Sequence, residues 1–411
     1  MHPPRRLWLH WAGLGLLGAA GPARSAPAQP GPDTSSHAAT ADAPAPDGDR
    51  IHPARTLRFP RDHGAHAGAR TEWWYATGWL NGADGAPSHG FQLTFFRSRQ
   101  GAAAVTNGTA EPAASTPPLA GRFAPAQWLF AHAAVTDLAA GRHRHAQRIT
   151  RWSGDERLPE AHARRGDTAL AIGPWRLQRS DRPGTGLDAA GSRYTARLAA
   201  PEAGFTLALQ LDSTQPRLLQ GQAGFSRKGP QPRQASHYYS QPQLAVQAEL
   251  TLDGRSRRLG GTGWLDHEWS DELLAPGATG WDWIGINLAD GGALTAFQLR
   301  DAAGQALWAG GSHRPAGGAV RSFAPDALRF EPLQWWTSPA SGARYPVRWR
   351  VHTPAGTHEL RALLDAQELD SRGSTGAIYW EGLAELRDGS GRRVGLGYLE
   401  MTGRSAPLRL G

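Results

Sequence analysis

The chain has 411 residues, a length that suits two domains better than one. It contains no cysteine, which excludes disulfides and a lipid-modified N-terminal cysteine. The formal charge of +8 is compatible with a nucleic-acid partner, but the basic residues are scattered among acids and form no basic run. We therefore expect a protein that binds no nucleic acid and is stabilised by its core alone.

The N-terminal residues predict export. Residues 1–28 contain Arg5 and Arg6, then an apolar run, then small residues, which is the pattern of a secretory signal peptide. The two adjacent arginines fit the twin-arginine route as well as the general secretory route. Residues 29–50 are rich in Pro, Ala, Asp and Ser, which predicts a disordered linker. No later apolar run is long enough to span a membrane, so we expect a periplasmic or secreted monomer.

From Ile51 onward, short alternating runs bounded by Gly, Pro or Asp-Gly predict β-strands. The clearest predicted strands cover residues 72–80, 90–97, 204–211, 245–252 and 281–288. Few segments favour a helix, and Gly (51) and Pro (31) are frequent, as expected for short strands joined by turns. The sequence therefore predicts an all-β protein.

An internal repeat predicts two similar domains. Residues 73–97 and 281–300 each contain an aromatic strand, a turn with Asp-Gly and a return strand with Phe-Gln-Leu. Asp-Gly between alternating runs is a strong hairpin signal. The repeat favours two β-barrels or sandwiches, which we expect at residues 51–240 and 241–411.

Several motifs together resemble a known family. They are "TEWWYATGWL", "GFQLTFFR", "GTGWLDHEWSDE", "GWDWIGINLADG", "YWEG" and "GYLEMTG". Spread over residues 51–403, they resemble the carotenoid 1,2-hydratase (hydroxyneurosporene synthase) family and, more closely, its exported AttH-like relatives, described as predicted secreted hydrolases. The resemblance implies two tandem lipocalin-like antiparallel β-barrel domains. It also implies a hydrophobic ligand of isoprenoid or lipid-like type.

The segment from Trp264 to Trp283 combines four tryptophans with five carboxylates and one histidine. Strand alternation places Asp266 and Glu268 on one face and His267 on the other. Burial beside apolar rings and a second carboxylate raises a carboxyl pKa, so that the acid can protonate a C=C bond at neutral pH. Aromatic rings stabilise the resulting cation by ~0.5–2 kcal/mol each. Water then captures the cation, so the chemistry predicted is a cofactor-independent hydro-lyase reaction.

The candidate catalytic residues are Asp266, Glu268 and His267. The candidate ligand-binding residues are aromatic and acidic side chains of this segment, of its counterpart in the first domain and of the expected domain junction: Trp264, Trp269, Trp281, Asp282, Trp283, Glu72, Trp73, Trp74, Tyr75, Tyr238 and Tyr239.

A purely structural role is the alternative for the acidic and aromatic residues at 266–269 and for their counterparts at 72–75. Asp266 and Glu268 would then accept backbone N–H bonds, and the tryptophans would close the end of a barrel. Glu72 would pair with an arginine such as Arg70 or Arg97.

Other functions fit the sequence less well. No metal site is predicted, because adjacent residues such as Asp266, His267 and Glu268 cannot all reach one ion from a strand. A secreted hydrolase remains an alternative, although the chain has no Gly-x-Ser-x-Gly motif. A non-catalytic periplasmic lipid carrier that serves a membrane transporter is the main alternative to the hydratase.

Overall fold

The computed structural model of the protein describes residues 49–99, 127–183 and 191–408. The predicted signal peptide and nearly all of the predicted linker therefore lie outside the described residues. Within them, the regular elements are strands and three short 3-10 helices, η2 (Arg61–His63), η3 (Pro201–Ala203) and η4 (Pro325–Ala327). No helix in this part of the chain has the length and apolar character needed to cross a membrane.

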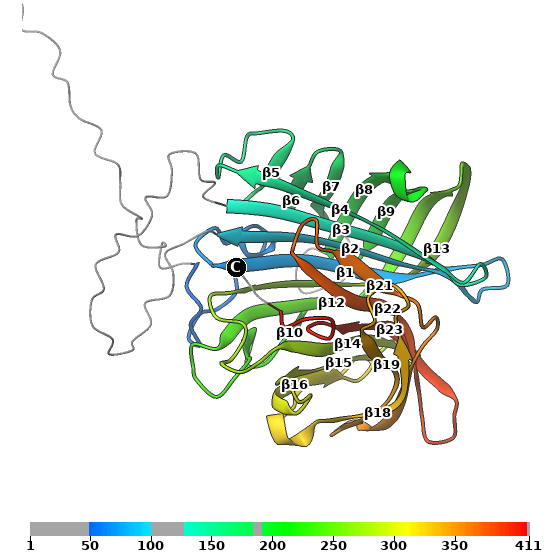
Figure 1. Cartoon of the computed structure of the whole chain (residues 1–411). Helices are drawn as coiled ribbons and strands as arrows, with labels where there is room; N and C mark the ends of the chain where they lie inside the picture. Colours follow the sequence, from blue (N-terminus) through cyan, green and yellow to red (C-terminus); the bar gives the residue numbers. More distant parts are fainter. Residues whose placement is uncertain (1–48, 100–126, 184–190, 409–411) are drawn as a thin grey trace, which may run out of the picture. The chain divides into compact units, whose positions relative to one another are not determined.

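The first sheet is antiparallel and nearly closes into a barrel (Figure 1). Its strands are β1 (Thr71–Asn81), β2 (Pro87–Arg99), β3 (Gln127–Asp137), β4 (Arg142–Trp152), β5 (Ala161–Ala163), β6 (Ala169–Ile172), β7 (Trp175–Arg182), β8 (Gly191–Ala200), β9 (Phe205–Asp212), β10 (Leu218–Leu219), β11 (Phe225–Arg227), β12 (Ala235–Leu252) and β13 (Arg255–Ser270). Their order is β4-β3-β2-β1-β13-β12-β9-β8-β7-β6-β5, with β10 and β11 paired to β12. The two end strands, β4 and β5, come into contact and so bring the sheet close to closure.

The second sheet is also antiparallel. Its strands are β14 (Gly280–Leu288), β15 (Ala293–Arg300), β16 (Ala306–Arg314), β17 (Arg321–Ser322), β18 (Arg329–Thr337), β19 (Arg344–Thr353), β20 (Gly356–Ala362), β21 (Glu368–Ser371), β22 (Ala377–Arg387) and β23 (Arg393–Met401). Their order is β17-β16-β15-β14-β23-β22-β20-β19-β18, with β21 paired to β22. The all-β prediction is confirmed, and two antiparallel sheets are consistent with tandem lipocalin-like domains. The domain limits stay a prediction; the first sheet continues to Ser270 and the second begins at Gly280.

The two halves of the predicted repeat form equivalent hairpins. β1 pairs with β2 and with β13, the last strand of its sheet. β14 pairs in the same way with β15 and with β23, the last strand of the second sheet. The repeated aromatic strand therefore occupies a central position in both sheets.

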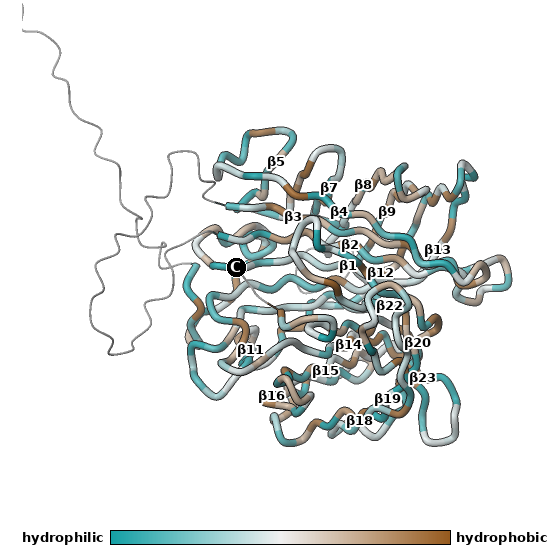
Figure 2. Tube along the Cα trace, in the orientation of Figure 1, coloured by the Kyte–Doolittle hydropathy of each residue, from teal (hydrophilic) through white to brown (hydrophobic). Residues whose placement is uncertain are grey.

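Three separate apolar clusters explain why these central strands carry large side chains on both faces. Trp74 belongs to the core enclosed by the first sheet, and Ile284 belongs to the core of the second. Tyr75 and Trp283 belong to a third cluster, which contains residues of both sheets. Apolar and polar residues are consequently interspersed along the strands (Figure 2). Each central strand is buried on two sides, against its own core and against the other sheet.

Candidate functional site

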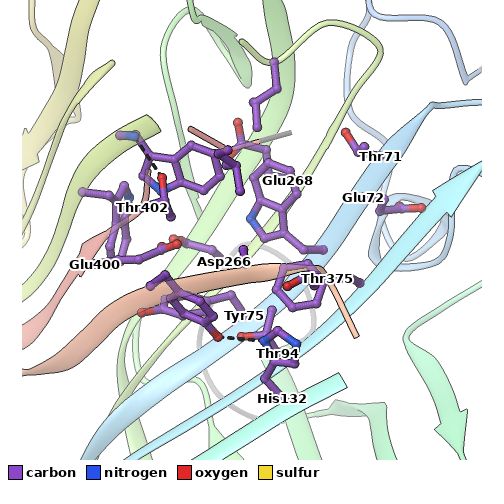
Figure 3. A pocket seen from close by; sticks show the side chains of 18 of the residues that line it. Thr71, Glu72, Tyr75, Thr94, His132, Asp266, Glu268, Thr375, Glu400 and Thr402 are labelled. Atoms are coloured by element: carbon purple, nitrogen blue, oxygen red, sulfur yellow. Dashed lines mark hydrogen bonds between the residues drawn. The ribbon is translucent and has the colours of Figure 1, made fainter. Parts of the chain in front are cut away.

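A cavity of about 300 Å³ lies between the two sheets. Residues of β1, β2, β3, β12 and β13 line it from the first sheet, and residues of β14, β15, β22 and β23 line it from the second. Most of its surface is apolar, yet Asp266, Glu268, Glu381 and Glu400 line it, as does Glu72. Figure 3 shows Asp266, Glu268, Tyr75 and Glu400 around this space. An apolar cavity with a few convergent polar groups is the usual form of a small-molecule site.

The register of three neighbouring strands directs the first two acids into the cavity. Asp266 of β13 lies opposite Tyr75 of β1 and Ser240 of β12. Glu268, two residues further along β13, lies opposite Trp73 and Tyr238. Because alternate residues of a strand point to the same side, Asp266 and Glu268 share one face, as the sequence predicts.

Asp266 is an acid in an apolar setting. Its carboxylate accepts hydrogen bonds from the Tyr238 hydroxyl and the Trp264 indole N–H, both at 2.7 Å. Burial raises the pKa of Asp266 to about 7; the nearby Glu268 adds to the rise, and the hydrogen bonds oppose it. Asp266 can therefore hold or release a proton near neutral pH, which a general acid must do.

Glu268 differs from Asp266 because it has a cation beside it. The Lys228 ammonium, which belongs to the only lysine of the chain, lies 2.8 Å from Glu268 Oε1. The Ser236 hydroxyl also donates to this carboxylate. The same ammonium lies over the Tyr238 ring at 4.9 Å and the Phe297 ring at 4.2 Å. Two carboxylates of one strand are thus held in different electrostatic settings, as in enzymes that divide acid and base roles.

The second sheet contributes the other two acids. Glu381 of β22 and Glu400 of β23 lie directly opposite each other. Burial raises the pKa of Glu381 well above its ordinary value, and the neighbouring Glu400 adds to this effect. Burial, together with Asp266 and Glu268, raises the pKa of Glu400 to about 8, against the effect of a hydrogen bond with Trp281. The pair therefore binds protons at neutral pH.

These raised pKa values predict that the protein loses stability as the pH rises. The folded protein holds protons on Asp266 and Glu400 that the unfolded chain has already released, so stability falls as the pH rises towards the folded-state pKa values. Urea unfolding should give a lower midpoint at about pH 9 than at about pH 6. Asp266→Asn should reduce the difference, whereas Asp155→Asn should leave it unchanged, because hydrogen bonds with Arg157 lower the pKa of Asp155 to about 2, far below this pH range. An equal pH dependence in Asp266→Asn and the unaltered protein would contradict the assignment.

Four candidate residues face away from the cavity, into the first barrel: His267, Trp269, Trp74 and Tyr239. His267 Nε2 lies 3.0 Å from Glu72 Oε1, and burial lowers the pKa of His267 to about 4. Glu72 borders the cavity, but its carboxylate points away from it (Figure 3). Its Oε2 accepts a hydrogen bond of 2.9 Å from Arg97 Nε, so the pairing with Arg97 foreseen as the structural alternative is present.

These buried groups form one connected set, here called the Glu72 network: His66, Glu72, Arg97, Tyr239 and His267. The nitrogen and oxygen atoms of His66, Glu72 and His267 lie within 4.8 Å of one another, a spacing that could hold a metal ion. Both His66 nitrogens already contact carboxylates, Asp62 at 3.0 Å and Glu72 at 2.8 Å. The Arg97 guanidinium compensates the charge of Glu72. The arrangement is therefore that of a hydrogen-bond network that joins β1, β2 and β13.

The three candidates on β14 divide between the two faces of that strand. Trp281 and Trp283 line the cavity. Asp282, between them, is buried on the other face, where it pairs with Arg300 and Arg404, each at 2.8 Å. The Trp283 indole lies across Gly285, where a Cβ atom would sit 2.3 Å from the ring. Trp264 lies in the cluster between the sheets, and its indole N–H donates a hydrogen bond to Asp266.

Several lining residues are absent from the sequence-based candidates, above all Lys228, Glu381 and Glu400. The pairs Trp380-Glu381 and Tyr398-Glu400 repeat the combination of an aromatic residue with an acid. That signal is visible in the sequence but weak by itself. The single lysine in an arginine-rich chain is a second signal of the same kind.

A serine–histidine contact at the cavity bears on the hydrolase alternative. Ser374 Oγ lies 2.9 Å from His132 Nε2 and 2.6 Å from Gln147 Oε1. The Gln147 Nε2 donates to the Asp370 carbonyl, which fixes the orientation of the amide. The atom that faces Ser374 is therefore the amide oxygen, which can only accept a hydrogen bond. A hydroxyl has one proton, which here goes to Gln147, so His132 donates to Ser374 and accepts from Tyr379. In this arrangement His132 does not act as a base for Ser374.

The fold and the cavity define an all-β protein of tandem lipocalin-like construction with an apolar, acid-lined site between its sheets. The chain belongs to the AttH-like family, whose sequence profile matches residues 50–404. The resemblance inferred from the motifs is thereby confirmed. No curated protein matches the sequence.

The solved structures that are similar to this one include the following two. An AttH-type protein from Nitrosomonas europaea is 42% identical, with a TM-score of 0.74, over 86% of this chain and 99% of that chain. Kievitone hydratase from Nectria haematococca is 13% identical, with a TM-score of 0.58, over 84% of this chain and 93% of that chain. The second likeness is one of fold.

Proposed function

We propose that the protein is a cofactor-independent hydro-lyase that adds water across a C=C bond of an apolar molecule of isoprenoid or lipid-like type. The observation that carries the proposal is Asp266, a buried carboxyl with a pKa of about 7 in a cavity lined by aromatic rings. The proposed location is the periplasm or the cell exterior, for which residues 1–28 are the support. The fold shared with kievitone hydratase, a hydratase by name, agrees with this assignment.

The reaction has three steps. The Asp266 carboxyl transfers its proton to one alkene carbon, and the two π electrons form the new C–H bond. The neighbouring carbon becomes a carbocation, which the faces of Trp73, Trp281 and Trp283 stabilise electrostatically. A water oxygen then bonds to that carbon and loses a proton to the Asp266 carboxylate. The net change is alkene plus water to alcohol, and the enzyme returns to its starting state.

The cavity favours a substrate that is small or that inserts one end. Its volume of about 300 Å³ is at the lower limit of the ~300–1,000 Å³ typical of ligand sites. A carrier of a neutral lipid would need the apolar rings but would gain nothing from the carboxyl groups, least of all from Asp266, which is 3% exposed, since burial of a carboxyl costs free energy. The carboxyl groups therefore favour catalysis over transport to a membrane partner.

An experiment in water labelled with ¹⁸O distinguishes a hydratase from a lipid carrier and from a hydrolase. The mature protein would be incubated in this water with a lipid extract of its source cells, and the extract analysed by mass spectrometry. A hydratase should yield a compound heavier than its precursor by one labelled water. A carrier would retain an unchanged ligand, detectable by native mass spectrometry, and a hydrolase would yield two fragments, one of them labelled. Either of the last two results would contradict the proposal.

A further inference from the structure

Lys228 and Glu268 form a buried ion pair in the wall of the cavity, and the three steps of the proposed reaction use neither residue. Their side chains are 7% and 6% exposed. A buried ion pair adds little net stability, because the loss of hydration offsets the attraction between the charges. Lys228 is also the only lysine of the chain, whose other basic side chains are arginines. The planar guanidinium of an arginine would engage both oxygens of a carboxylate, whereas an ammonium group leaves one of them available.

The contacts of the Glu268 carboxylate fall on one of its two oxygens. The Lys228 ammonium lies 2.8 Å from Oε1, and the Ser236 hydroxyl donates to the same atom. Among the residues that the structure describes, none donates a hydrogen bond to Oε2. Glu268 lines the cavity, so Oε2 is the oxygen that can accept a hydrogen bond from a molecule there. Water is the smallest molecule that can donate this hydrogen bond.

Glu268 lies beside two residues that the proposed hydration does use, Asp266 and Trp73. Asp266 precedes it by two residues on β13, and alternate residues of an antiparallel strand are ~7 Å apart on the same face. A water molecule between the two carboxyl groups can donate one O–H to each. Trp73 lies opposite Glu268 on β1 and lines the cavity, where it would stabilise the carbocation. Water bound to Glu268 would therefore be close to the acid and to the cation.

We infer that Glu268 binds, through Oε2, the water molecule that captures the carbocation, and that Lys228 is a positioning residue that fixes the Glu268 carboxylate. The inference rests on the proposed hydration and assigns the residue that holds its nucleophile. A lone pair of the water oxygen forms the C–O bond, and one O–H proton passes to the Asp266 carboxylate while the electrons of that bond stay on the oxygen. The other O–H remains hydrogen-bonded to Glu268 until the alcohol leaves.

The fate of the carbocation reports whether water is held in place. In heavy water the Asp266 carboxyl carries deuterium, so the alkene gains one deuteron when the cation forms. With water positioned, the cation is captured as the alcohol. Without it, the same carbon returns a proton to the Asp266 carboxylate, the C–H electrons restore the π bond, and the recovered alkene contains deuterium. The ratio of deuterated alkene to alcohol therefore measures capture by water separately from proton transfer by Asp266.

Glu268→Gln tests the role of the available oxygen. Lys228 and Ser236 both donate, so they select the amide oxygen, and the amide NH₂ group, which cannot accept a hydrogen bond, takes the place of Oε2. The protein would be incubated in heavy water with a lipid extract of its source cells, and the compounds that the unaltered protein hydrates would be followed by mass spectrometry. The ratio of deuterated alkene to alcohol should rise roughly tenfold to a hundredfold, the effect of losing one hydrogen bond to a charged group. Lys228→Met should raise the same ratio by a smaller factor.

Two further variants separate this role from a structural one. Glu385→Gln, in an ion pair with Arg387 and outside the cavity lining, should leave the ratio unchanged. Glu268→Gln combined with Lys228→Met leaves no buried charge without its partner, and this double variant should keep the high ratio.

An unchanged ratio in Glu268→Gln and in the double variant, with deuterated alkene and alcohol reduced by the same factor, would overturn the inference and leave the hydration standing. If the unaltered protein forms no alcohol from the extract, the hydration itself is contradicted, and the role of Glu268 with it.

Discussion

Asp266→Asn should lower the rate of product formation in the labelled-water assay by a factor of ~10²–10⁴, the usual contribution of general acid catalysis. The amide keeps the shape of the carboxyl group and can still hydrogen-bond to Tyr238 and Trp264, but it has no acidic proton to transfer. Ligand binding should therefore change little. Since only the protonated acid is active, the unaltered enzyme should also lose activity as the pH rises past the pKa of Asp266, about 7.

The control for this prediction is Asp388→Asn, which removes a half-buried carboxylate that does not line the cavity and should leave turnover unchanged. If Asp266 has only a structural role, its substitution should instead cost about 0.5–2 kcal/mol of stability, with binding lost in proportion to unfolding. A folded Asn variant that binds ligand and turns over at the normal rate would remove Asp266 from the mechanism.

Glu72→Gln should lower the free energy of unfolding by about 3–5 kcal/mol, the range for removing one partner of a buried ion pair. Glu72 is fully buried, and Arg97, which depends on it for charge compensation, is 1% exposed. The substitution also weakens the acceptor that His66 and His267 share. Urea unfolding of the variant and the unaltered protein at neutral pH measures the loss.

A surface ion pair provides the comparison. Glu359 pairs with Arg348 at 2.6 Å, with 29% and 44% of their side-chain surfaces exposed. Glu359→Gln should cost no more than ~1 kcal/mol, because solvent screens exposed pairs. If the two substitutions cost the same, the Glu72 network does not hold β1, β2 and β13 together as described here.

The features that the sequence predicted well are those set by neighbouring residues. The alternation of a strand separates Asp266 from His267 whatever the rest of the fold, and the structure has them on opposite faces. Applied to β14, the same alternation separates Asp282 from Trp281 and Trp283. Asp282 is accordingly buried in ion pairs on the far face of the strand.

The features that the sequence did not predict depend on contacts between distant segments. Glu400 affects the cavity only because β23 pairs with β14 and because the second sheet packs against the first. Glu381 in turn depends on the register between β22 and β23. No local pattern encodes these pairings, so the short motifs around Glu381 and Glu400 indicated little until the fold placed them beside Asp266.

Because the cavity lies between two sheets, the residues of one wall can be substituted independently of those of the other wall. Each wall is backed by a hydrophobic core of its own, so a substitution on one wall need not disturb the packing behind the other. Trp281, Phe297 and Leu299 of the second sheet can therefore differ among related proteins and reshape the space for the ligand, while the first sheet keeps Asp266 in place. A fold of this kind can retain one acid and diversify in the molecules that it accepts.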